Sequence, residues 1–162
     1  MSENQLVMNS KIVSSNVPVD INNLAVTGDY VSMKGYGNLA VILHFGAVGT
    51  GVAITLKQAT DVGNSLSDEK ALAYTKIYAN AGLTTDTLTE TAVTSSTYTF
   101  GNDPNQLYVI EVRAEDLDIN NSFDCVRVNV ASGAGTTVLG IIYVLYNPRY
   151  SGATPPISAI VD

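Results

Sequence analysis

Apolar and polar residues alternate with a period of two along most of the chain, which is the pattern of β-strands with one buried face. The clearest example is the segment 125–130, where Val126, Val128 and Val130 would face a core and the residues between them would point away. No segment keeps the period of an amphipathic helix. Alternation or a strand-like composition predicts strands near residues 6–13, 29–34, 39–45, 51–58, 70–78, 88–94, 98–100, 106–113, 123–131 and 138–146.

Residues that favour turns gather between these segments. Glycine, asparagine, aspartate or proline cluster at 35–37, 46–51, 61–64, 101–104 and 132–135. Many short strands separated by turns at roughly regular spacing are typical of a sandwich. We therefore predict an all-β fold, a single antiparallel β-sandwich or jelly roll.

Two predicted strands, 39–45 and 138–146, are apolar on both faces. In a sandwich of two sheets, one face of each strand should meet water. Loops or chain ends of the same protein would cover the second face, or it would form a subunit interface, since monomers rarely expose large apolar patches. The two interpretations are compatible. The candidate interface residues on this second face are Ile42, His44, Ile142, Val144 and Tyr146.

The ends of the chain look extended. We expect an N-terminal arm over 1–18, a sandwich domain over 19–146 and a proline-containing C-terminal arm over 147–162. Prolines in the last segment preclude a helix or a central strand there, yet its apolar residues are unlike a disordered tail. Such an arm lies on its own domain or on a neighbour, and its removal should leave the sandwich folded. The candidate contact residues in it are Pro148, Arg149, Tyr150, Pro155, Pro156 and Ile157.

The net charge of the chain limits the kinds of partner that it could bind. The 162-residue chain carries a formal net charge of −7, and its eight basic residues are scattered. Nucleic-acid binding normally needs a basic stripe, so we expect no nucleic-acid partner. Acidity also argues against binding to anionic membranes, and no apolar run is long enough for a helix that spans a bilayer. The N-terminus lacks the features of a signal peptide, and one cysteine, Cys125, allows no internal disulfide.

Residues that could carry chemistry are few. His44 is the single histidine, and no serine lies in a nucleophile motif. The acidic turn 115–121 resembles the start of a calcium loop, but Asn121 and Arg127 stand where that loop needs glycine and glutamate. We therefore predict no enzyme, and no catalytic, cofactor-binding or metal-binding residues.

Four stretches of the sequence resemble the decoration, or cement, proteins of tailed bacteriophage heads. They are Asp29-Tyr-Val-Ser-Met-Lys-Gly-Tyr-Gly-Asn-Leu-Ala-Val-Ile-Leu-His-Phe-Gly-Ala-Val, Gly51-Val-Ala-Ile-Thr-Leu-Lys-Gln-Ala-Thr-Asp, Glu69-Lys-Ala-Leu and Tyr146-Asn-Pro-Arg-Tyr, in this order. The resemblance implies a jelly-roll or β-sandwich homotrimer without a cofactor. It also implies that the protein is made in the host cytoplasm, binds the major capsid protein and stabilises the outer capsid surface of the virion.

Two other functions fit the same residues. One is a carbohydrate-binding β-sandwich module of a tail or fibre, for which the nine tyrosines would supply aromatic surfaces. The other is a tail or baseplate structural subunit, which would assemble as a six-fold ring. The mass of the protein in solution separates these expectations, because a trimer, a hexamer and a monomer differ in size.

Overall fold

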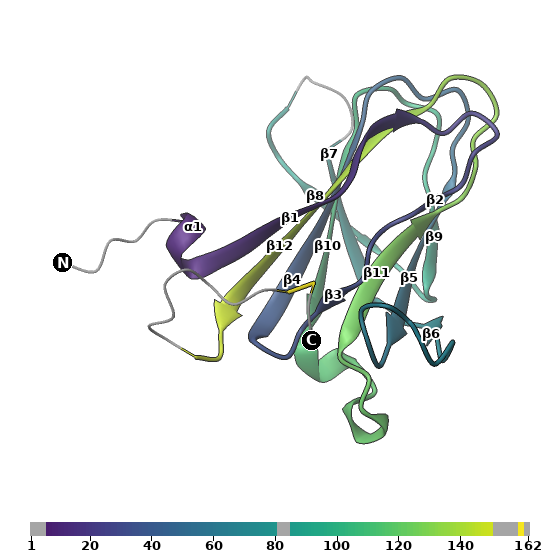
Figure 1. Cartoon of the computed structure of the whole chain (residues 1–162). Helices are drawn as coiled ribbons and strands as arrows, with labels where there is room; N and C mark the ends of the chain where they lie inside the picture. Colours follow the sequence, from purple (N-terminus) through teal and green to yellow (C-terminus); the bar gives the residue numbers. More distant parts are fainter. Residues whose placement is uncertain (1–5, 81–84, 151–158, 161–162) are drawn as a thin grey trace.

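The computed structural model describes residues 6–80, 85–150 and 159–160. Antiparallel strands form two sheets that pack face to face (Figure 1), which confirms the predicted all-β sandwich. The elements are α1 (Leu6–Asn9), β1 (Ser10–Asp20), β2 (Val26–Thr27), β3 (Val31–Ser32), β4 (Tyr36–Phe45), β5 (Ala53–Ala59), β6 (Lys70–Ala71), β7 (Lys76–Asn80), β8 (Thr89–Ala92), β9 (Thr97–Thr99), β10 (Leu107–Arg113), η1 (Ala114–Asp116), η2 (Ile119–Asn121), β11 (Cys125–Val130) and β12 (Val138–Pro148).

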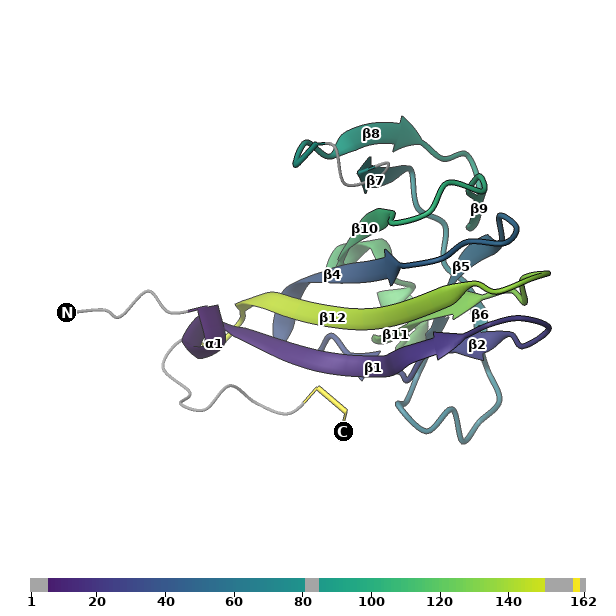
Figure 2. The same ribbon diagram turned by 90° about the horizontal axis from the view of Figure 1, so that it is seen from above.

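The larger sheet has the strand order β1-β12-β4-β10-β7-β8, which can be followed from above in Figure 2. The smaller sheet has the order β2-β11-β5-β6, with β3 beside β11 and β9 beside β5. From β9 onward, successive strands alternate between the sheets, because β9 and β11 belong to the smaller sheet and β10 and β12 to the larger. Such crossing places strands distant in sequence side by side, as in jelly rolls.

The core lies between the sheets and is built from the alternating residues. Val126 and Val128 of β11, in the smaller sheet, are fully buried, as the alternation predicts. Leu43 of β4, in the larger sheet, is also fully buried. At one end of the core the rings of Phe45 and Phe100 pack with their centroids 4.4 Å apart. Aromatic and branched side chains of this size fill the space between two sheets about 10 Å apart.

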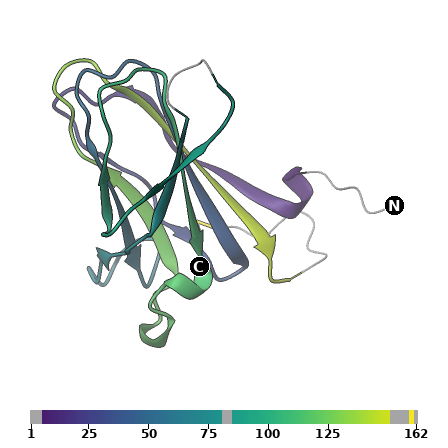
Figure 3. The same ribbon diagram turned by 180° about the vertical axis from the view of Figure 1, so that it is seen from behind.

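The predicted N-terminal arm is wrong for residues 10–18. These residues belong to β1, which pairs with β12 from Ser10 opposite Tyr146 to Asp20 opposite Val138. The alternation is hard to recognise because the pairing register shifts twice, between Ser14 and Asn16 and between Asn16 and Val19. β1 is the outermost strand of its sheet, a position where Pro18 is tolerated. Together, β1 and β12 extend past the smaller sheet toward α1, as Figure 3 shows from behind.

The predicted boundary at residue 147 also falls inside a strand. β12 continues to Pro148, which lies opposite Tyr36 of β4. Farther along, Ala159 is fully buried in the core, and its carbonyl accepts a hydrogen bond from the Ser32 amide. Where it is described, the C-terminal segment therefore lies on its own domain. We accordingly expect its removal to lower the stability of the sandwich.

Among the described residues, no helix has the length and apolarity needed to cross a bilayer.

Candidate functional site

The outward side of the larger sheet carries a continuous group of apolar residues. Ile42 of β4 lies directly opposite Ile142 of β12 on one side and opposite Val109 of β10 on the other. Residues opposite one another in antiparallel strands share a face, so these three side chains form a row across three strands. Neighbouring positions of the same face extend the row. We call the whole group the apolar outer face: Ile12, Ala40, Ile42, Leu107, Val109, Ile142 and Val144.

This face is partly open to solvent, although the opposite side of β4 and β12 is buried. Ile12 is 46% exposed and Ile142 is 42% exposed, whereas Ile141, the next residue along β12, is fully buried. Ile42 and Val144 are half-buried by their neighbours within the sheet. No described segment of the chain covers Ile12 or Ile142 as a loop or chain end would. The structure thus provides an apolar surface of the kind that monomers seldom leave exposed.

The predicted interface residues on these strands lie together. His44 is exposed at the end of the face, opposite Gly140 and Leu107. Tyr146 lies at the other end, where its hydroxyl donates to the Glu111 carboxylate over 3.2 Å. Burial, followed by the nearby Glu111 charge, raises the pKa of Tyr146 above its ordinary value. The tyrosine therefore remains a neutral donor that fixes the position of a carboxylate at the rim of the face.

The other predicted contact residues are spread along the end of β12 and beyond it. Pro148 is half-buried, and the backbone amide of Arg149 donates to the Gly35 carbonyl over 2.9 Å. Tyr150 is 70% exposed. Pro155, Pro156 and Ile157 lie outside the described residues. Sequence reasoning did not include Ile12, Leu107 and Val109 in the face, although their alternation within 6–13 and 106–113 was a usable signal.

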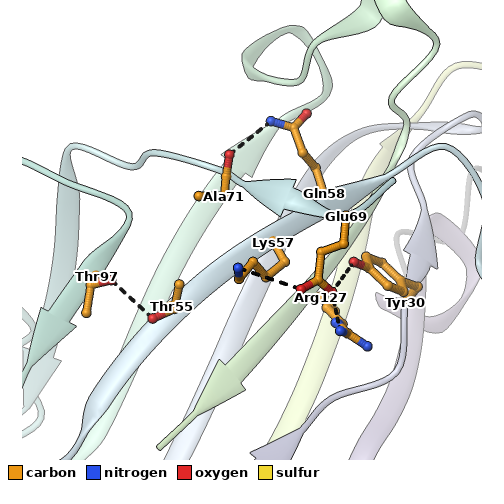
Figure 4. Close-up of polar contacts among 8 residues, drawn as sticks. All are labelled: Tyr30, Thr55, Lys57, Gln58, Glu69, Ala71, Thr97 and Arg127. Atoms are coloured by element: carbon orange, nitrogen blue, oxygen red, sulfur yellow. Dashed lines mark hydrogen bonds and ion pairs between the residues drawn. The ribbon is translucent and has the colours of Figure 1, made fainter. Parts of the chain in front are cut away.

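The outward side of the smaller sheet is polar and is centred on Glu69 (Figure 4). Its carboxylate accepts a hydrogen bond from the Tyr30 hydroxyl over 2.7 Å and another from the Arg127 guanidinium, and it pairs with Lys57 over 3.6 Å. The Arg127 guanidinium carbon also lies 4.6 Å from the centroid of the Tyr30 ring. These contacts attach the loop that carries Glu69 to β5 and β11.

The electrostatics of this cluster favour a structural role. Burial alone would raise the pKa of Glu69, but the Tyr30 hydrogen bond and the charges of Arg127 and Lys57 together lower it. Burial, with the Glu69 hydrogen bond next, raises the pKa of Tyr30 well above its ordinary value. Glu69 is therefore held ionised and Tyr30 is held neutral, so neither group is poised to exchange protons near neutral pH.

Cys125 differs from the position that the alternation suggests. The pattern puts its side chain on the polar side of β11, yet it is fully buried beside Tyr30 and Ala59, with Val62 packed against them. Its sulfur donates to the Asp124 carboxylate over 3.1 Å. A thiol enclosed in this way is shielded from reagents in solution.

The acids of the turn 115–118 are each paired with a cation. Asp116 and Glu115 both pair with Arg113, at 2.9 Å and 2.6 Å, while Asp118 pairs with Lys70. Within residues 6–80, 85–150 and 159–160, no three histidine, cysteine, aspartate or glutamate side chains converge as metal ligands would.

Comparisons with known proteins give only distant likenesses. No protein-family model matches the chain, and no curated protein sequence matches it. The solved structure of the SPBc2 prophage-derived protein YomS is 12% identical, with a TM-score of 0.45, over 84% of this chain and 93% of that one. The structure of infectious bursal disease virus Gt strain is 13% identical, with a TM-score of 0.25, over 92% of this chain and 44% of that one. The VP2 subviral particle of infectious bursal disease virus is 12% identical, with a TM-score of 0.24, over 94% and 44% of the respective chains. At these levels the likenesses assign neither a family nor a function to this chain.

Proposed function

We propose that this protein is a non-enzymatic structural component of a bacteriophage particle that binds the outer surface of the capsid as a decoration protein. The observation that carries the proposal is the apolar outer face of the larger sheet. It adds a physical surface for assembly to the sequence resemblance, which runs from Asp29 to Tyr150. The function follows from contacts between proteins and requires no reacting group.

Self-association is the first use of this face. Each large aliphatic side chain that moves from water into an interface contributes up to about 1.5–3 kcal/mol, and proportionately less where it is already half-buried. Ile12, Ile142, Ile42 and Val144 supply four such side chains on adjacent strands. A second copy is the occupant that the charge distribution favours. The chain has a net charge of −7, but the members of the apolar outer face are all uncharged, and Glu111 lies at its rim opposite Ala40, so copies can meet over the apolar residues while keeping this acid at the edge.

Capsid binding then falls to surfaces that remain free in the assembly. Three copies in a closed ring would present their strand ends and C-terminal segments around one axis, which suits attachment where neighbouring capsid proteins meet. Weak contacts repeated by symmetry add up to firm attachment. The acidic surface suits the outside of a capsid better than the interior that faces DNA. The partners in this proposal are therefore other copies of the chain and the major capsid protein.

The first experiment is the solution mass of the whole chain, measured by size-exclusion chromatography with light scattering. We expect a trimer that Ile42→Asp disrupts, since the substitution puts a charge into the centre of the apolar outer face. The matched control is Leu66→Asp, which places the same acid at an apolar residue that is 72% exposed in the loop next to Glu69. The control should assemble like the unmodified chain. A monomeric unmodified chain, or an Ile42→Asp variant that still forms trimers, would contradict the assignment of this face.

The second experiment is cosedimentation with bare capsids built from the major capsid protein of the same virus. The unmodified chain should sediment with these capsids in a saturable way, and Ile42→Asp should sediment less because it loses the avidity of the trimer. A trimer that never binds capsids would contradict the decoration role while leaving the subunit interface intact. A hexamer would instead favour a tail or baseplate subunit.

A further inference from the structure

A notch opens beside the apolar outer face where two strands of the larger sheet separate. β7 pairs with β10 only where Tyr78, Ala79 and Asn80 lie opposite residues 107–109. Before Tyr78 the chain comes from the smaller sheet, where the buried Tyr74 donates its hydroxyl hydrogen to the Ile54 carbonyl over 3.0 Å. The second half of β10 therefore has no strand on this side among the described residues. The resulting hollow has a volume of about 460 Å³.

The side chains around the notch are polar, and their charges cancel. Lys76 and Arg113 supply two positive charges, while Glu111 and Asp116 supply two negative ones. Each already has a hydrogen-bonding or ion-pair partner. Lys76 donates to Glu90 over 3.0 Å, Arg113 pairs with Asp116 over 2.9 Å, and Tyr146 donates to Glu111. An anionic ligand would have to displace an acid from Lys76 or Arg113, and it would meet the charges of Glu90, Glu115 and Glu111 nearby.

An uncharged ligand with many hydroxyl groups meets no such obstacle. Hydroxyls donate to the free oxygen positions of paired carboxylates and accept from the unused N–H groups of lysine and arginine. Asn38 adds an amide whose oxygen accepts from Asn147 over 3.2 Å, which leaves its nitrogen as a donor. Tyr78, half-exposed in the wall, offers an aromatic surface for the C–H face of a sugar ring. The volume is within the range of ordinary small-ligand pockets.

We propose that this notch is a binding site for a neutral saccharide of one or two sugar rings. Tyr78 provides the surface on which a ring packs, and Glu111, Arg113, Asn38 and Asp116 hydrogen-bond its hydroxyls. The notch borders the apolar outer face, because Tyr78 lies opposite Val109 and Glu111 lies opposite Ala40. Saccharide binding is measured without capsids, so it can fail or succeed independently of the proposed function. A particle decorated with this protein would thereby carry a sugar-binding surface in addition to a stabilised capsid.

The test is a titration of the whole chain, labelled with ¹⁵N, with maltose, lactose, N,N′-diacetylchitobiose and α-mannobiose, followed through the backbone amide signals. At least one of these disaccharides should shift the amides of residues 74–78 and 111–116 saturably. Failure of all four to do so, or saturable shifts only elsewhere on the protein, would overturn the proposal. Inorganic phosphate, titrated in parallel, should leave these signals unchanged. Tighter binding of phosphate than of any disaccharide would overturn the neutral-ligand assignment.

Variants then test the assigned roles with the disaccharide that binds best. Tyr78→Ala should weaken binding roughly tenfold because the ring contact is lost, whereas Tyr78→Phe should bind as the unmodified chain does. Tyr150→Ala removes an exposed tyrosine outside the notch and should have no effect. Glu111→Gln keeps the shape of the wall but removes a charged acceptor, so it should also weaken binding roughly tenfold. This variant tests the site independently if Tyr78→Ala does not fold. Unchanged affinity in both Tyr78→Ala and Glu111→Gln would overturn the site.

Discussion

Replacing Tyr143 by phenylalanine removes one oxygen atom from the centre of the sandwich, and this oxygen joins the two sheets. Tyr143 lies on β12 of the larger sheet and is fully buried. Its hydroxyl accepts a hydrogen bond from the backbone N–H of Val128, on β11 of the smaller sheet, over 3.0 Å. The Ser15 side chain also hydrogen-bonds this hydroxyl, and Ser15 in turn accepts from the Asp29 amide over 2.9 Å. Burial raises the pKa of Tyr143 to about 12, so the group is neutral at any ordinary pH.

The expected loss follows from the groups that the substitution leaves without a partner. A buried donor deprived of its acceptor costs about 1–3 kcal/mol, and here both the Val128 amide and the Ser15 hydroxyl are affected. We expect Tyr143→Phe to lower the free energy of unfolding by about 2 kcal/mol. In a chain of this length, that corresponds to a fall in Tm of about 4–8 °C. With a urea m-value of about 2 kcal/mol/M, the denaturation midpoint should fall by about 1 M.

Urea denaturation followed by circular dichroism measures this change. The control is Tyr150→Phe, which removes the same atom from an exposed side chain and should stay within about 0.5 kcal/mol of the unmodified chain. Gly28 offers a second check, because a Cβ atom there would lie 2.5 Å from the Tyr143 oxygen. Gly28→Ala should therefore be less harmful when Tyr143 is already phenylalanine, and a double-mutant cycle measures this coupling. A Tyr143→Phe variant as stable as the unmodified chain would refute the role of the hydroxyl.

Two other predictions concern stability. The pKa of Glu69 is lowered in the folded protein from its ordinary value of 4.5, so its ion pairs stabilise the fold above that pH and are lost as the pH falls toward the folded value. The fall in Tm below pH 4.5 should be shallower in Glu69→Gln, and an identical fall in both proteins would contradict this assignment. Ending the chain after Tyr150 removes the buried Ala159 and its hydrogen bond with Ser32, and it should lower Tm measurably. An unchanged Tm would show that Ala159 contributes nothing to the core.

The residues of the apolar outer face show how much of a surface can be predicted from alternation with a period of two. The alternation in 39–45 and 138–146 indicated two apolar sides, and Ile42 and Ile142 do lie on the outward one. Sequence alone did not reveal that these two residues face one another, because strand order depends on pairing between distant segments. The same pairing adds Val109 and Ile12 from two other strands.

The two ends of the chain depend on the same physical factor. The broken alternation of segment 10–18 predicts an extended arm, yet an edge strand tolerates both the bulges and the proline that break the pattern. The apolar residues of segment 147–162 predict that it lies on its own domain or on a neighbour, and Ala159 does fill part of the core of its own domain. In both cases the deciding factor was whether a distant element offered a partner.

By itself the sequence determined the fold class, since alternation, turn residues and a strand-rich composition all favour an antiparallel sandwich. It also established the acidic charge and the scarcity of residues that could carry chemistry. Only the tertiary structure decided the polar cluster around Glu69, the enclosure of Cys125 and the notch beside Tyr78. Each of these joins residues that are far apart in the chain. The contacts between these residues depend on the order in which the strands pair and on the places where neighbouring strands separate. Local strand propensity encodes neither of these.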